Sequence, residues 1–366
     1  MKIYKNYDEI LSEVTELGKS TETLGYTSGG LPLISIRTGG DKLPAIFVTA
    51  GSHSTEHAGV SASMDLLTSL ETNHQVYIYP TRDPIGMNGF AYALSLALGR
   101  VPVIESYEQV DSLLREEGYV VYEEDEMLLA IIGEYGYSYS RPTDSYPDPQ
   151  YRVHQNLVSL SKNRAELVEP FRGRRVFIPA GQPEVEGAGE YDRAFTFIVA
   201  PDGEVLHLNR FHDTKWSPPE AFCARKLLEK IQPGLSFDLH ESQFMEDRYW
   251  LSPRHLQDPE DDLWETRIAT EIVSAIKDNG AVLAFDKDID HGKPIKDTCF
   301  YKSEPGVYWL DDTIRGEGLN LSDFISRNHG LIFGTETGMY GEFRKRVELA
   351  KITVETAVKI FEERFV

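Results

Sequence analysis

The stretch PAIFVTAGSHSTEHAGVSASMDLL, residues 44–67, decides the fold. Its first six residues are almost all apolar and Gly51 soon follows, a pattern that predicts a short buried strand. From residue 58 to residue 70 the apolar side chains recur at helical spacing, which predicts a helix. A strand, a loop and a helix in this order indicate a parallel sheet with crossover helices.

The rest of the chain continues this alternation. We predict strands at 31–38, 75–79, 235–239, 281–285 and 331–335, and helices at 6–18, 219–232, 264–278 and 346–363. We therefore expect an α/β fold with a central mixed, largely parallel twisted sheet and helices on both faces. Residues 1–366 are expected to form a single domain. Within it, residues 91–190 are rich in acidic residues and tyrosine without clean alternation, and we predict a large insertion or lid there.

Composition limits the classes of function. The formal net charge is −22, which argues against nucleic acid or an anionic membrane as a partner. The two cysteines, Cys223 and Cys299, are too few for a disulfide scaffold. The sequence shows no secretion signal and no apolar run long enough to span a membrane, so we expect a cytoplasmic protein. Nothing in the sequence indicates an oligomeric state.

The first candidate site follows the predicted strand at residues 44–49. His53 and Glu56 stand at the carboxyl end of that strand, where open α/β sheets form their sites, and both are residue types that bind zinc. Two other interpretations are open at this point. Ser54 or Thr55 can cap the helix, with surface histidines beside it. Alternatively, His53-x-x-Glu56-His57 fits an inverted zincin pattern, in which both histidines bind zinc and the glutamate is the base.

Three further clusters carry possible chemistry. His240, in FDLHE, stands at the carboxyl end of a second apolar strand, where a third ligand is needed. The pair Asn209-Arg210 can hold a carboxylate through a guanidinium fork and an amide donor. Glu336 leaves a buried strand among small residues and is suited to act as a general base. Each also has a plain interpretation: a structural histidine, a surface pair and a solvent-facing glutamate.

Taken in order, HxxE, Asn-Arg, a strand-borne His and a strand-end Glu resemble the M14 zinc metallocarboxypeptidases, whose fold is that of carboxypeptidase A. The resemblance includes the stretch FVTAGSHSTEHAGVSASMDLL, the turn YPTRDPIGMNGF at 79–90 and the segment TETGMYG at 335–341. It leaves out residues 91–190. With it, the inverted zincin and helix-cap interpretations become the weaker ones.

The resemblance implies one zinc ion per chain, bound by three residues: His53, Glu56 and His240. It implies that Glu336 takes a proton from the attacking water and passes it to the leaving amine. Asn209 and Arg210 would hold the terminal carboxylate of the substrate. Arg193 lies 17 residues before Arg210, where the family places an arginine that stabilises the developing oxyanion.

The chain also departs from the family pattern. His207 stands where the family has an aspartate that orients the first zinc histidine, so this contact must be built differently or is weakened. Phe211 adds no polar contact after the Asn-Arg pair. Residues 313–315 stand where many members carry a mobile tyrosine, with Tyr301 and Tyr308 nearby. These departures bear on peptide cleavage more than on zinc binding.

We therefore predict a zinc-dependent hydrolase that cleaves an amide bond, as a metallocarboxypeptidase removing a C-terminal residue from a peptide. One alternative is a deacylase of small N-acyl amino acids, resembling aspartoacylase and succinylglutamate desuccinylase. Another is a non-catalytic binding protein on the same fold. The charged residues in the region that usually lines the side-chain pocket are Arg248, Lys287, Lys293, Arg315, Asp286, Asp288, Asp290, Asp311 and Asp312.

Overall fold

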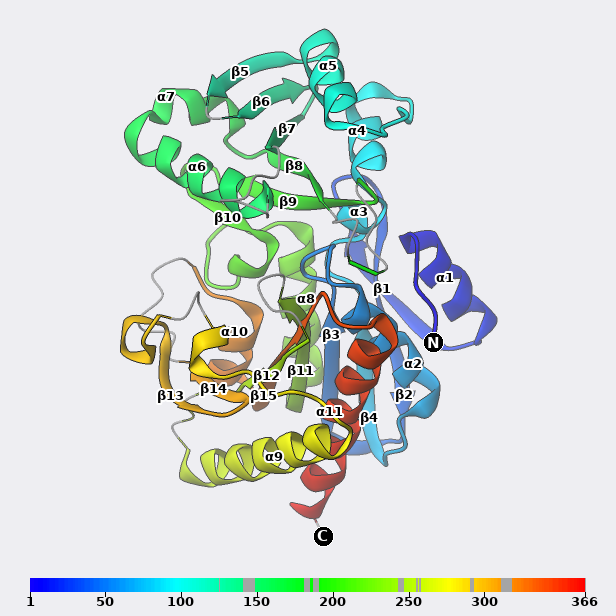
Figure 1. Cartoon of the computed structure of the whole chain (residues 1–366). Coiled ribbons are helices and arrows are strands. Elements are labelled where there is room, and N and C mark those ends of the chain that lie inside the picture. Colours follow the sequence, from blue (N-terminus) through cyan, green and yellow to red (C-terminus); the bar gives the residue numbers. More distant parts are fainter. Residues whose placement is uncertain are drawn as a thin grey trace.

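The computed structural model describes residues 1–124, 126–140, 149–180, 185–186, 191–242, 247–254, 256, 258–289, 293–310 and 318–365. These residues build a mixed α/β fold with two sheets, and the predicted fold class is confirmed (Figure 1). Residues 313–315 and four of the charged residues expected near the side-chain pocket lie outside the described part: Asp290, Asp311, Asp312 and Arg315.

The central sheet has nine strands in the described part of the chain. In spatial order they are β1 (Ser20–Tyr26), β2 (Pro32–Gly39), β4 (His74–Tyr79), β3 (Lys42–Ala50), β11 (Pro233–Ser242), β15 (Leu331–Gly338), β12 (Tyr249–Ser252), β14 (Val307–Leu310) and β13 (Phe300–Glu304). The middle four, β4, β3, β11 and β15, run parallel to one another. Antiparallel pairs complete the edge at β1 and β2, and the other edge combines antiparallel pairs with the parallel pair of β12 and β14. The carboxyl ends of these four strands therefore lie at one edge of the sheet.

Helices cover both faces of the central sheet. On one face α2 (His57–Ser69), α9 (Pro259–Asp278) and α11 (Phe343–Glu363) share a core with the strands, and α1 (Tyr7–Glu16) joins it. On the other face α8 (Pro219–Ile231) and α10 (Leu321–Asn328) do the same. Strand β3 shows why its sequence is continuously apolar. Ile46 and Val48 face the first core and Phe47 faces the second, so both sides of the strand are buried.

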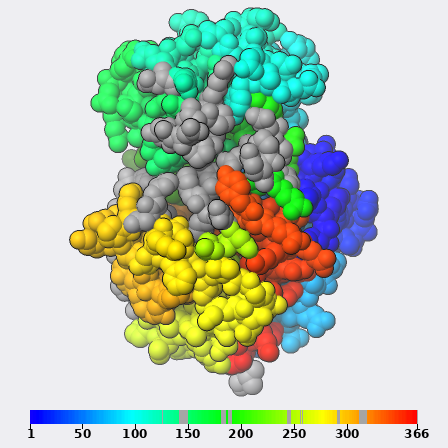
Figure 2. All heavy atoms as spheres, in the orientation of Figure 1, coloured from blue at the N-terminus to red at the C-terminus, as the bar shows by residue number. Residues whose placement is uncertain are grey.

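A second sheet of six strands forms the upper lobe of the molecule, coloured cyan to green in Figures 1 and 2. In spatial order its strands are β10 (Val205–His207), β9 (Arg193–Val199), β8 (Arg175–Ala180), β7 (Tyr135–Ser140), β6 (Met127–Ile132) and β5 (Tyr119–Glu124). Its helices are α4 (Phe90–Leu98), α5 (Tyr107–Glu117), α6 (Pro149–Asn163) and α7 (Ala165–Val168), and the short α3 (Pro84–Met87) leads into it.

The predicted insertion at 91–190 contains four strands of this second sheet, β5 to β8. The other two strands, β9 and β10, lie beyond residue 190. Strand β9 pairs with β8, and β10 pairs with β9. The sheet therefore continues to residue 207, close to the Asn209-Arg210 pair. The division of the chain into one domain with an insertion stays a prediction.

One predicted element is wrong, and several elements were not expected, among them β12, β13 and β14. Residues 281–285 form no strand: Leu283 makes a single bridge to Tyr249, because β14 occupies the same edge of β12 from Leu251 onward. Strand β1 forms in a stretch that the sequence marks only as polar, and α10 was not predicted. Among the described residues, the short 3-10 turns are η1 (Glu169–Phe171), η2 (Leu208–Arg210), η3 (Asp286–Asp288) and η5 (Ile295–Asp297). In the described residues, no helix has both the length and the apolar character needed to cross a membrane.

Candidate metal centre

Three predicted ligands come together at the carboxyl ends of β3 and β11. His53 and Glu56 lie in the loop from β3 to α2, and His240 lies near the end of β11, which pairs in parallel with β3. One donor atom from each residue lies within 4.8 Å of the other two. The Nδ1 atoms of His53 and His240 are 2.6 Å and 2.8 Å from the two carboxylate oxygens of Glu56. The three side chains therefore converge on one point.

The turn out of β3 depends on a glycine. Gly51 has φ +58°, and a Cβ at this position would meet the hydroxyl oxygen of Thr81 at 2.6 Å. The backbone N–H of Arg82 donates to the carbonyl groups of Ala50 and Gly51, at 3.2 Å and 3.1 Å, which ties the loop after β4 to this turn. A side chain larger than hydrogen would push these two loops apart.

The charges around the three residues suit a cation. Burial raises the pKa of Glu56, but the imidazoles of His53 and His240 outweigh it and leave that pKa below its usual value. Burial lowers the pKa of His240, and Asp238 and Glu56 more than reverse this, so the pKa lies well above the ordinary value. Two imidazole nitrogens and one carboxylate are the donor set that zinc accepts in catalytic sites. The residues present therefore fit a zinc ion.

The outer nitrogen of each histidine has its own partner. Nε2 of His53 lies 3.0 Å from Nδ1 of His207, and Nε2 of His240 lies 3.0 Å from a carboxylate oxygen of Asp238. Both histidines thus keep Nδ1 for the shared centre, in the manner of metal-binding histidines held by a second partner. His207 stands where the family resemblance implied an aspartate. The outer nitrogen of His53 therefore has a partner, but this partner is an imidazole instead of a carboxylate.

Arg82 connects several of these groups, and its role was missed by sequence reasoning. Its Nη2 lies 2.7 Å and 2.8 Å from the two oxygens of Asp238, and its Nη1 donates to Oδ1 of Asn209 at 3.0 Å. Arg82 is 2% exposed and Asp238 is fully buried. Burial raises the pKa of Asp238, but Arg82 and His240 more than offset this and hold the pKa below its usual range. The signal in the sequence was an arginine in the turn that follows an apolar strand, three residues after Tyr79.

Asn209 and Arg210 differ in their surroundings. Asn209 is 4% exposed, and its Oδ1 also accepts from the backbone N–H of Leu321 at 3.1 Å. Its Nδ2 lies 3.2 Å from Nε2 of His240. Arg210 is half-buried at the end of η2, and its positive charge helps to lower the pKa of His53, which burial lowers most. Arg210 therefore lies within electrostatic reach of the candidate metal centre.

Glu336 is placed beside the ligands by strand register. In the ladder between β11 and β15, His240 pairs with Glu336, and in the next ladder Glu336 pairs with Trp250 of β12. Paired residues on neighbouring strands point to the same face, so Glu336 shares the face of His240. Burial raises the pKa of Glu336 to about 8, with His240 opposing the shift and Glu56 adding to it. A bound cation would lower this pKa.

Arg193 lies in another environment from the one predicted. Its guanidinium donates to the carbonyl oxygens of Tyr4, Lys5 and Asp192, each at 2.8 Å. Its Nε donates to Nδ1 of His57 at 3.4 Å. The side chain is 2% exposed, and burial lowers the pKa of Arg193 to about 10. The structure thus brings Arg193 to the N-terminal segment and His57, and its role at an oxyanion stays a prediction.

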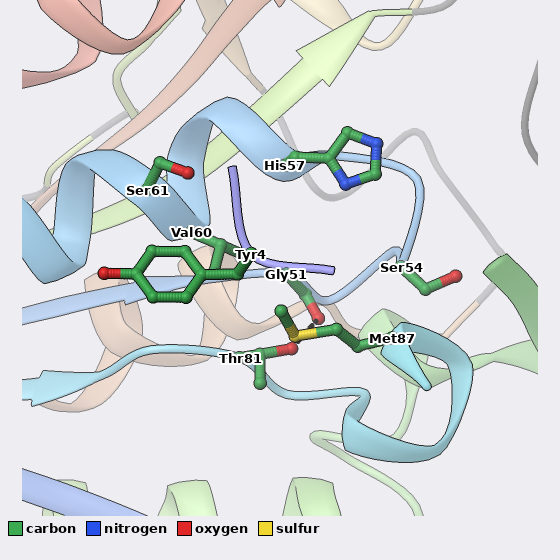
Figure 3. Close-up of a pocket in the computed structure, with 8 residues that line it drawn as sticks. All are labelled: Tyr4, Gly51, Ser54, His57, Val60, Ser61, Thr81 and Met87. Carbon is green, nitrogen blue, oxygen red and sulfur yellow. Dashed lines mark hydrogen bonds between the residues drawn. The ribbon is translucent and has the colours of Figure 1, made fainter. Parts of the chain in front are cut away.

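His57 is not part of the candidate metal centre. It lines a small cavity together with Tyr4, Ser61 and Thr81, as Figure 3 shows. Its Nδ1 accepts from Arg193, and its ring is absent from the metal-binding group found in the described residues. The geometry therefore does not support the inverted zincin interpretation.

The helix-cap interpretation of this loop also lacks support. Ser54 donates to the carbonyl oxygen of Ala194 at 2.6 Å, and the N-cap residue Glu56 makes no side-chain cap. The backbone N–H of Ala58 instead donates to Glu241 at 2.8 Å, from the opposite face of β11. The start of α2 is satisfied from outside the loop, which leaves the side chains of the loop available for binding.

Comparisons with known proteins agree with this fold. No family model matches the chain, and no curated protein matches it by sequence. A solved metallo-carboxypeptidase from Burkholderia cenocepacia matches with a TM-score of 0.50 and 10% identity, over 98% of this chain and 69% of that one. A metallo-carboxypeptidase from Pseudomonas aeruginosa in complex with (2-guanidinoethylmercapto)succinic acid matches over 98% and 69%, with a TM-score of 0.48 and 13% identity. Carboxypeptidase A from Helicoverpa armigera matches with a TM-score of 0.47 and 11% identity, over 99% of this chain and 73% of that one. Identities this low speak for the fold alone: the chain has a fold like that of a metallo-carboxypeptidase.

Proposed function

We propose that this protein is a zinc-dependent hydrolase that removes a C-terminal residue from a peptide. One observation carries the proposal: His53, Glu56 and His240 converge, and Glu336 stands in register with His240 on the neighbouring strand. Metal-assisted hydrolysis needs a set of metal-binding side chains and, beside it, a carboxylate that can act as a general base.

The residues of the chain divide the work. Zinc bound at the three ligands supplies a Lewis acid and a water molecule of lowered pKa. Glu336 accepts the proton of the attacking water and delivers it to the leaving nitrogen. Arg210 binds the terminal carboxylate of the substrate through charge-assisted hydrogen bonds. Arg193 has no part in this proposal, because its guanidinium donates hydrogen bonds to the carbonyl groups of Tyr4, Lys5 and Asp192 and to the ring of His57.

The test combines metal analysis with hydrolysis. We expect about one zinc ion per wild-type chain by elemental analysis, and loss of it in His240→Ala. Glu336→Gln should keep the zinc and lose turnover by at least about a hundredfold, because the amide cannot accept the proton. Wild-type protein that takes up no zinc, or a Glu336→Gln variant with normal turnover, would exclude the proposed chemistry.

The substrate class needs a parallel assay. A series of peptides with free C-termini and a series of small N-acyl amino acids should be tested with the same zinc-loaded protein. Release of C-terminal residues supports the proposal. Turnover of N-acyl amino acids alone would point to the deacylase, since Arg210 can bind the carboxylate of either substrate class. Zinc binding without turnover of either class would point to a binding protein.

A further inference from the structure

We propose that Arg82 and Asp238 are positioning residues that fix which nitrogen of His240 binds the metal. The inference rests on the proposed function in one respect, since it takes His53, Glu56 and His240 as metal ligands. It adds that a buried ion pair beneath this group fixes the tautomer of His240, and that Asn209 belongs to the same network rather than to the substrate pocket.

The directions of the hydrogen bonds carry the argument. An arginine side chain can only donate, so Asp238 must accept at both oxygens from Arg82, at 2.7 Å and 2.8 Å. Asp238 in this ion pair is an ionised carboxylate, which can only accept, so its oxygen 3.0 Å from Nε2 of His240 accepts as well. This requires a proton on Nε2 of His240. The lone pair for a metal is then on Nδ1, the atom that lies 2.8 Å from Glu56.

Asn209 cannot take over this role. Its Oδ1 accepts from two donors, Arg82 and the backbone N–H of Leu321, which fixes the orientation of the amide. Its Nδ2 is thus the atom that faces His240, and an amide N–H₂ has no lone pair to accept from Nε2–H. Asp238 is the acceptor that remains for His240.

Three separate segments supply the network. Arg82 comes from the loop after β4, Asn209 from η2, and Asp238 lies two residues before His240 on β11, so that both side chains point to the same face. Arg82, Asp238 and Asn209 are at most 4% exposed. A charge so deeply buried is costly once its partner is removed, so neither half of the pair can be lost without moving the other.

This placement separates the roles of two neighbouring residues. Asn209 is nearly inaccessible and its acceptor oxygen is occupied, so it holds the ligand group in place. Arg210 is left as the residue that meets the carboxylate of the substrate. Substitution of Asn209 by alanine should therefore lower zinc affinity, whereas substitution of Arg210 by methionine should raise KM and leave zinc affinity unchanged.

The experiment compares this ion pair with a matched control. Arg175 and Glu220 form a similarly buried pair, 2.6 Å apart and 6% and 2% exposed, which is hydrogen-bonded within itself and not to His53, Glu56 or His240. Zinc dissociation constants of Arg82→Met, Asp238→Asn, Arg175→Met and Glu220→Gln would be measured by competition with a chromogenic chelator, and Tm by circular dichroism. We expect zinc affinity about 10- to 100-fold weaker in the first two variants. The control variants should lose thermal stability but keep wild-type zinc affinity.

Two results would overturn the inference while leaving the proposed function intact. One is a folded Asp238→Asn variant with wild-type zinc affinity, and the other is an equal loss of affinity in the control variants. Nitrogen-15 NMR of zinc-loaded wild-type protein gives a readout that needs no variant at the ion pair. We expect His240 bound through Nδ1 with a proton on Nε2, and zinc on Nε2 would contradict the inference. Wild-type protein that binds no zinc would instead remove the proposed function, and this inference with it.

Discussion

Nδ1 of His207 lies 3.0 Å from Nε2 of His53, so a strand of the second sheet contacts a predicted metal ligand in the loop after β3 of the central sheet. The same ring of His53 stacks on Phe195 of β9, with centroids 5.3 Å apart and planes 14° apart. The second sheet therefore holds both the outer nitrogen and one face of this imidazole. The geometry of the candidate metal centre depends on both sheets.

Replacement of His207 should weaken zinc binding without unfolding the protein. In His207→Ala, Nε2 of His53 loses its partner, and we expect zinc affinity to fall about 10- to 100-fold. His207→Asp keeps an acceptor at this place and should retain most of the affinity. Competition with a chelator measures both. His329→Ala is the control, because His329 lies at the end of α10 and its Nδ1 is 3.3 Å from the side-chain oxygen of Gln232. Equal losses in the His207→Ala and His329→Ala variants would argue against the His207–His53 contact.

Arg210 should affect substrate binding and not metal binding. A hydrogen bond to a charged group contributes about 1.5–3 kcal/mol, which corresponds to a factor of roughly 10–100 in affinity. We expect Arg210→Met to raise KM for a peptide with a free C-terminus by this factor. The KM of Arg210→Lys should lie between those of wild type and Arg210→Met, because an ammonium group keeps the charge but cannot form the bidentate fork. A C-terminally amidated peptide is the control substrate: if Arg210→Met affects both peptides equally, Arg210 does not bind the carboxylate.

Asp83 should make stability depend on pH. It is 1% exposed, it accepts from Thr196 at 2.8 Å and from the N–H of Gly86 at 2.9 Å, and burial raises its pKa to about 7. The folded protein thus holds this proton more tightly than the unfolded chain does. The stability that this proton contributes is complete below pH 4 and is lost as the pH rises towards 7.

Replacing Asp83 by asparagine removes this titration. The unfolding free energy of Asp83→Asn relative to wild type should rise by up to about 4 kcal/mol between pH 4 and pH 8. Loss of one hydrogen bond adds a constant offset that does not change with pH. Urea unfolding across this range measures the difference. Asp258→Asn, the same substitution at the exposed N-cap of α9, is the control. A difference that stays flat with pH would contradict the assignment.

Arg346 should be essential for stability. Its Nη1 lies 2.5 Å from Glu241, and the two side chains are 1% and 0% exposed. Removing one partner of such a pair leaves a buried charge and costs about 3–5 kcal/mol, so Arg346→Met should be strongly destabilised. The double variant Arg346→Met/Glu241→Gln should recover part of this loss, and denaturant titration would show it. A double variant less stable than Arg346→Met alone would rule out this explanation.

Much of the central fold could be predicted because its signals are local. The strands β3 and β15 place apolar side chains in the cores on both faces, so they appear in the sequence as short apolar runs ended by polar or small residues. The second sheet gives a weaker signal. In β7, YGYSYS, tyrosine alternates with glycine and serine, and β5 has an exposed, acidic end, so neither strand resembles an apolar core strand.

The site was predictable only in part for the same physical reason. The ligand types and their order along the chain are properties of the sequence, and the structure brings His53, Glu56 and His240 together. The contacts of Arg82 could not be predicted in this way, because Asn209 and Asp238 lie 127 and 156 positions further along the chain. Spacing alone also says little about Arg193: its donors are directed at carbonyl groups and at His57, and its role at an oxyanion stays a prediction.

The turn between β9 and β10 acquires an importance that its sequence does not suggest. It spans residues 200–204, closed by hydrogen bonds between Ala200 and Glu204 and between Gly203 and Ala200, and it sets the register that pairs His207 with Phe197. A slip of one residue would turn His207 to the other side of the sheet and carry the following Asn209-Arg210 segment with it. The length of a surface hairpin therefore bears on the geometry of the candidate metal centre. Engineering or natural variation at this turn can alter that geometry while His53, Glu56 and His240 stay unchanged.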